Sequence, residues 1–72
     1  MDPVLRELLI QRIAELAPGS RFNLPALLAN EWPNQAGVAR QLGRQFRAHL
    51  VDFEGTIDAG RDNENLRWYQ KL

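Results

Sequence analysis

The 72-residue chain has no cysteine and only one histidine and one methionine. The lack of cysteine excludes disulfide bonds and thiolate metal sites, which often supplement the small core of a domain of this length. Metal ligation would have to rest on His49 and carboxylates, and these show no ligand spacing. The sequence therefore predicts no metal and no other cofactor.

The chain also lacks net charge and long apolar runs. Its nine basic and nine acidic residues cancel, so total charge gives no support for a nucleic-acid partner. No apolar stretch approaches the roughly 18 residues of a membrane span, and the N-terminus lacks the basic start and apolar run of a signal peptide. We expect a single cytoplasmic domain over residues 1–72, without a membrane partner.

Catalytic motifs are absent as well. The sequence contains no HExxH, GxSxG, glycine-rich phosphate loop or CxxC. Ser20 and Tyr69 have no nearby base in sequence. His49 projects toward the apolar face of a predicted helix, where a partly buried histidine is a more natural expectation than a general base. We expect that the protein is not an enzyme.

The first helix is predicted to run from Pro3 to about Leu16. Asp2 can cap its free N–H groups, and Pro at the first helical position loses no hydrogen bond. Pro18 and Gly19 then end it. The helix carries an apolar stripe of Leu5, Leu9, Ile13, Leu16 and Ala17. Val4 and Leu8 fall outside this stripe, so either a neighbouring element covers them or they form a patch for a dimer or another partner.

A second, short helix is predicted after Asn23, which is a good cap. It should end near Asn30 or Glu31, because Pro33 disfavours helical geometry at Trp32. Asn34 can cap a third helix over residues 35–51. So short a link makes the two helices cross steeply, as in a helix-turn-helix.

The third predicted helix has an apolar face and a basic face. At about 100° per residue, its apolar side chains fall within an arc of roughly 120°; they are Val38, Leu42, Phe46, His49 and Leu50. Arg40, Arg44 and Arg47 cluster on the opposite side, with Gln41 at the border. No Asp or Glu lies between Asn34 and Val51, so these arginines have no partner within their own helix and are available to an anion.

After Val51 the pattern alternates and predicts a β-hairpin, with a turn in the sequence AGRDNE at 59–64. The expected packed face is Phe53, Ile57, Leu66 and Trp68. Trp32 and Trp68 could stack on bases, but packing is the expected role of both in so small a domain. The hairpin region is rich in acids and would repel phosphate: it holds Asp52, Glu54, Asp58, Asp62 and Glu64 against Arg61 alone.

The predicted fold class is α+β: three helices followed by a C-terminal β-hairpin, in the order of a winged helix-turn-helix. The chain also resembles a family of short bacterial and phage domains that has no assigned activity. The resemblance covers most of the chain after Ala17 and implies a fold, but it transfers no catalytic residue. Its marks are PGSRFNLPALL at 18–28, EW at 31–32, LGRQF at 42–46, and Asn65, Arg67 and Tyr69.

The leading functional prediction is sequence-specific binding of double-stranded DNA by the third helix. Arginine can contact guanine and phosphates in the major groove, and glutamine can contact adenine. Arg21 and Arg67 would assist the third helix. The protein would be a small regulator of transcription, bacterial or encoded by a phage, and a homodimer. The alternative is a protein-interaction module, an adaptor or inhibitor, that uses the arginine face or Val4 and Leu8 without binding DNA.

Overall fold

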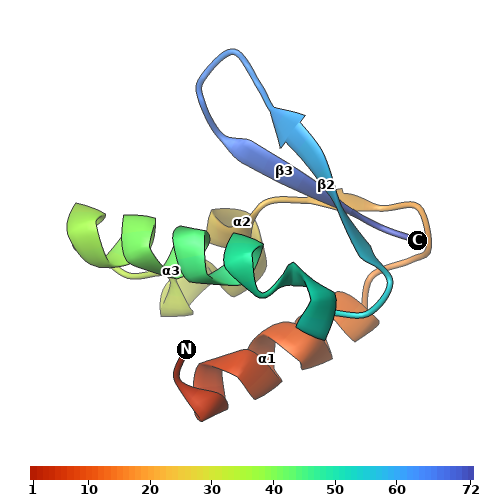
Figure 1. Ribbon diagram of the computed structural model, residues 1–72, viewed down its shortest axis with the longest axis horizontal. Coiled ribbons are helices and arrows are strands. Elements are labelled where there is room, and N and C mark those ends of the chain that lie inside the picture. Colours follow the sequence, from red (N-terminus) through yellow and green to blue (C-terminus); the bar gives the residue numbers. More distant parts are fainter.

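The chain folds into three α-helices and a three-stranded antiparallel sheet, as shown by a computed structural model that describes residues 1–72 (Figure 1). The C-terminal hairpin projects from the layer formed by the helices. The elements, in chain order, are α1 Pro3–Ala14, β1 Arg21–Phe22, α2 Leu24–Leu28, the 3-10 turn η1 Ala29–Glu31, α3 Ala36–Ala48, the 3-10 turn η2 Leu50–Asp52, β2 Thr56–Arg61 and β3 Arg67–Lys71. The predicted α+β class and winged helix-turn-helix order are confirmed.

Helices α1 and α2 begin at the predicted caps. The Asp2 carboxylate accepts a hydrogen bond of 3.1 Å from the Val4 backbone N–H. The Asn23 side chain accepts one of 2.9 Å from the Ala26 N–H. Helix α1 ends at Ala14, slightly earlier than expected. The local capping signals therefore fixed where these helices start more accurately than where α1 stops.

A cap at Asn34 would start α3 at Gln35, but the helix starts at Ala36. Gln35 is the N-cap and makes no side-chain hydrogen bond, so the predicted cap at Asn34 is wrong. The first helical bond runs from the Ala39 N–H to the Gln35 carbonyl over 2.9 Å. Because Gln35 is itself extended and takes the N-cap position, Asn34 lies outside the helix, before its cap.

The inner face of α3 is shorter than predicted. Leu42 and Phe46 are buried, as expected. The helix ends at Ala48, and His49 departs from helical dihedrals with φ −110° and ψ 27°. The predicted place of His49 on the apolar face is therefore wrong: its side chain is 61% exposed, with Nδ1 4.0 Å from an Asp52 carboxylate oxygen. Val38, near the other end, is also exposed.

The sheet has the order β1-β3-β2, so β3 is its central strand. Phe22 of β1 pairs with Tyr69 of β3, and both side chains face the core. On the other side of β3, Thr56 pairs with Lys71. Thr56 and Tyr69 are the buried residues of the hairpin strands, which places the packed face one residue away from the expected register.

The expected packed face of the hairpin is therefore wrong at Ile57, which is 42% exposed. Leu66 and Trp68 are only half-buried, whereas Phe53 is buried as predicted. Gly55, at φ 79°, redirects the chain between Phe53 and β2. A one-residue offset turns every side chain of a strand to the other face, so Thr56 faces inward in place of Ile57.

The hairpin is also longer than expected. A β-bulge interrupts the pairing between Asp58 and Gly60, and the strands continue to Arg61. The turn predicted at 59–64 therefore begins too early, and the connecting loop is 62–66. A bulge adds a residue to one strand without ending it, which is why a glycine within β2 resembled a turn signal.

Aromatic contacts hold α3 against the sheet. The Phe46 ring lies 4.5 Å from the Phe53 ring and 4.8 Å from the Tyr69 ring, centroid to centroid. Phe22 adds a contact of 5.7 Å to Tyr69. Because Phe46 is fully buried in the core and contacts both Phe53 and Tyr69, it holds α3 beside the hairpin.

Candidate functional site

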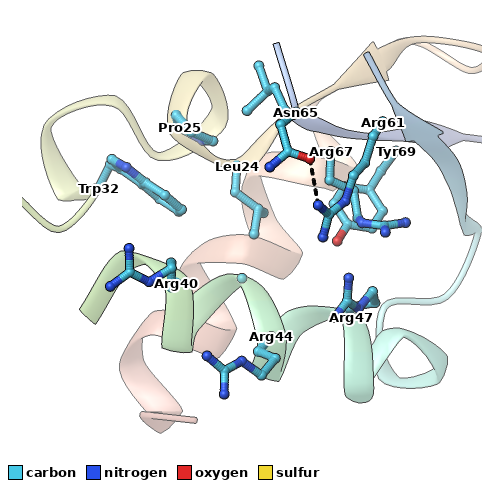
Figure 2. A pocket seen from close by; sticks show the side chains of 12 residues that line it. Leu24, Pro25, Trp32, Arg40, Arg44, Arg47, Arg61, Asn65, Arg67 and Tyr69 are labelled. Atoms are coloured by element: carbon cyan, nitrogen blue, oxygen red, sulfur yellow. Dashed lines mark hydrogen bonds between the residues drawn. The ribbon is translucent and has the colours of Figure 1, made fainter. Parts of the chain in front are cut away.

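A groove of about 370 Å³ lies between α3, the α2 region and the hairpin (Figure 2). Five of the side chains that line it are arginines, and no Asp or Glu lines it. Arg40, Arg44 and Arg47 come from α3, and Arg61 and Arg67 come from the two strands of the hairpin. Converging positive charges without a carboxylate create a local field that attracts anions.

The three arginines of α3 share one face because they are four and three residues apart. All three are exposed, and none of them takes part in an ion pair. The arginine–carboxylate pairs of the chain are Arg12 with Glu31 and Arg67 with Asp58. The guanidinium groups of α3 therefore bring uncompensated charge to the groove.

The two arginines of the hairpin have partners within it. Arg61 donates a hydrogen bond of 2.6 Å to the Asn65 side-chain oxygen (Figure 2). Arg67 donates one of 2.5 Å to the Asp58 carboxylate. Arg61 is thus positioned by a neutral group and keeps its full charge for a ligand, whereas Asp58 offsets part of the charge of Arg67.

Apolar side chains form the end of the groove next to α2. Leu24, Pro25 and Trp32 lie there, and the Trp32 indole extends toward Leu24 with Arg40 across from it (Figure 2). Trp32 adopts an extended conformation, with φ −67° and ψ 128°, as the following Pro33 favours. The groove therefore combines guanidinium groups with a half-buried aromatic side chain.

Tyr69 contributes to the groove from β3, beside Arg67. Burial disfavours the charged phenolate, and the nearby Asp58 carboxylate adds to this effect, so the pKa of Tyr69 is raised above its ordinary value of 10.0. Tyr69 therefore remains a neutral phenol at physiological pH and brings no negative charge to the groove.

Two of the hairpin acids that were expected to repel phosphate, Asp58 and Asp62, make hydrogen bonds within the hairpin. Asp62 accepts hydrogen bonds from the Trp68 indole over 2.9 Å and from the Leu66 and Glu64 N–H groups over 3.0 and 2.9 Å. These bonds, that of Trp68 first, lower the pKa of Asp62. Asp58 is held by Arg67 and by the Gly60 N–H. None of the hairpin acids lines the groove.

Other residues singled out by the sequence lie elsewhere. Gln41 is exposed on α3 but does not line the groove. The Arg21 guanidinium lies 5.5 Å from the centre of the Trp68 ring, also outside the groove. Val4 is 76% exposed, whereas Leu8 packs partly against the core.

Sequence reasoning missed Arg61 as a site residue and Trp32 as a neighbour of the arginines. Arg61 stands among acids in the sequence, which made it resemble a neutralised loop residue. The weak available signal was the separation of Arg61 and Asn65 by four positions around an expected turn, which allows contact across a hairpin loop.

Comparison of the chain with protein-family models, curated proteins and solved structures finds no match. The resemblance to short bacterial and phage domains is therefore supported only at the level of a small α+β fold. No group of three or more metal-ligating side chains is close enough to hold an ion, and none of the helices has the length and apolarity to cross a membrane.

Proposed function

We propose that this domain binds double-stranded DNA through α3 and the adjoining arginine groove. The observation that carries the proposal is the row of unpaired guanidiniums at Arg40, Arg44 and Arg47, in a groove without carboxylates. The helix follows a short link after α2, the place of a recognition helix. Arg61 adds charge from the hairpin, which occupies the position of a wing.

The wider proposal is a small regulator of transcription in the cytoplasm of a bacterium, or one encoded by a phage. This source is proposed from the motifs at 18–28 and 42–46, which resemble those of short bacterial and phage domains. We expect a homodimer, because helix-turn-helix proteins commonly read two half-sites with two copies of α3. Gln41, exposed beside the arginine row, is the candidate for an adenine contact. Arg21 is left out because its guanidinium lies over Trp68.

A salt titration of binding to a pool of random-sequence duplexes tests the proposal. Each neutralised phosphate contributes a slope of about −0.9 to log K against log salt. Three contacts from α3 give about −2.7, so affinity should fall about 40-fold when salt rises from about 50 to about 200 mM. Absence of binding at the lower salt concentration would refute the proposal.

Substitutions locate the contact on the protein. Arg44→Ala should weaken binding and flatten the salt slope by about 0.9. Arg6→Ala is the matched control, because Arg6 belongs to α1 and does not line the groove. Equal losses in the two variants would indicate non-specific attraction and not a defined interface.

The alternative is a protein-interaction module, an adaptor or inhibitor, that holds an acidic surface. The observation that favours it is again the absence of ion pairs at the arginines of α3, because guanidiniums can also bind carboxylates in bidentate fashion. Poly-glutamate is the probe for this alternative. Binding of poly-glutamate that depends on Arg44, together with no binding of duplex DNA, would favour the interaction module.

A further inference from the structure

The two tryptophans of the chain differ in how they are engaged. The Trp68 indole N–H donates to Asp62 over 2.9 Å, and Arg21 lies over the Trp68 ring at 5.5 Å. Trp32 has neither kind of partner: its N–H makes no hydrogen bond within the chain and is not among the buried polar atoms without partners. No guanidinium or aromatic ring of the chain stacks on it. Trp32 thus offers an accessible donor and a ring without a stacking partner.

The position of Trp32 makes this ring useful to a ligand of the groove. Part of the side chain packs against the core, which holds it in place. The rest lines the groove beside Leu24, with Arg40 across from it (Figure 2). Proteins that bind single strands combine these two features, an aromatic side chain that stacks on a base and cationic side chains that follow the backbone.

The bases of an intact duplex are stacked on one another and present only their edges in the grooves, so only an unpaired base can stack on Trp32. The groove of about 370 Å³ falls within the range of small-molecule sites and has room for one such nucleotide beside a bound duplex. We infer that the DNA bound here presents an unpaired nucleotide to the groove, with its base on Trp32 and its phosphates on the arginines of α3. The inference rests on the proposed function and narrows its ligand to a duplex with a single-stranded end.

Three DNA ligands separate stacking from charge. They are a blunt duplex, the same duplex with a short thymine overhang, and the same duplex with an overhang of abasic sites. The two overhangs carry equal numbers of phosphates, so their affinity ratio reports the bases alone. Each base that stacks on an aromatic side chain raises the binding affinity, so we expect the thymine overhang to bind about ten-fold more tightly than the abasic one.

Variants of Trp32 test whether this side chain causes the difference in affinity between the two overhangs. Trp32→Leu should bring the ratio close to one, and Trp32→Phe should retain part of it because a ring remains. If Trp32→Leu does not fold, fluorescence decides. In Trp68→Phe the only indole is Trp32, and its emission should be quenched by the thymine overhang but not by the abasic overhang.

The outcomes distinguish the inference from the proposed function. Equal affinities for the two overhangs, or no selective quenching, would overturn the inference while leaving duplex binding intact. Absence of binding to all three DNAs would overturn the proposed function and the inference together. A ratio that persists in Trp32→Leu would also overturn the inference, because the base would then contact some other part of the protein.

Discussion

Arg12 connects α1 to the C-terminal end of α2, and its replacement should destabilise the fold far more than loss of its ion-pair partner. One of its guanidinium nitrogens donates hydrogen bonds of 2.9 Å to both the Leu27 and Leu28 carbonyls. Another lies 3.0 Å from the Glu31 carboxylate. Arg12 therefore satisfies carbonyls that the end of a helix leaves without partners, and its charge suits that end of the helix dipole.

The expected loss in free energy of unfolding is larger for Arg12→Met than for Glu31→Gln. Hydrogen bonds from a charged donor contribute about 1.5 to 3 kcal/mol each. The Arg12 side chain is 29% exposed, so the lower value applies, and Arg12→Met should reduce the free energy of unfolding by about 3 kcal/mol. Met keeps an aliphatic stem for packing. Glu31→Gln removes a surface ion pair and should reduce it by about 0 to 1 kcal/mol.

Urea unfolding followed by far-ultraviolet circular dichroism measures both effects. A domain of this length has a total stability of about 4 to 11 kcal/mol, so Arg12→Met should move the midpoint strongly with an unchanged slope. Arg12→Lys keeps the charge but not the forked donor, and it should fall between wild type and Arg12→Met. Equal losses in Arg12→Met and Glu31→Gln would show that the carbonyl contacts contribute nothing beyond the ion pair.

Two further predictions concern a cap and a buried phenol. Asn23→Ala removes the hydrogen bond to the Ala26 N–H and should reduce the free energy of unfolding by about 1 kcal/mol in urea, while Asn23→Asp should change it little. The raised pKa of Tyr69 means that the unfolded chain loses its phenol proton first, so stability is retained below pH 10 and lost as pH rises through the folded-state pKa. The free energy of unfolding should fall less steeply above pH 10 in Tyr69→Phe. Tyr69 is the only tyrosine, so the absorbance of its phenolate gives the pKa directly. A pKa at the ordinary value would contradict this prediction.

The order of elements was predictable because its signals are local. Asp2 and Asn23 cap the helices that follow them, and each signal spans only a few residues. The helical period placed Leu42 and Phe46 in the core for the same reason. His49 escaped this logic because the helix stops just before it, and a periodic pattern does not state where it ends.

The face of the hairpin was not predictable from alternation. Alternation shows which residues share a face, but the glycine turn at Gly55 and the bulge near Gly60 set the register. Tyr69 is buried in the core through its ring contacts with Phe22 and Phe46. These contacts join segments far apart in the sequence, so no local pattern reports them.

Only the α3 side of the candidate site was predictable from the sequence. The row of Arg40, Arg44 and Arg47 follows from the helical period alone. The groove also requires the hairpin to lie beside α3, which places Arg61 opposite that row. The position of the hairpin depends on packing around Phe46, and this information belongs to the tertiary structure.

The acidic residues and the arginines of α3 differ in how they are used in the fold. The net charge is zero, yet several acids serve the fold: Asp2 caps α1, Asp58 holds Arg67, and Asp62 organises the hairpin loop. The arginines of α3 have no such partners within the chain. The charge of these arginines is not used by the fold and lies on a groove that no acid lines, which is the physical basis for proposing a negatively charged ligand there.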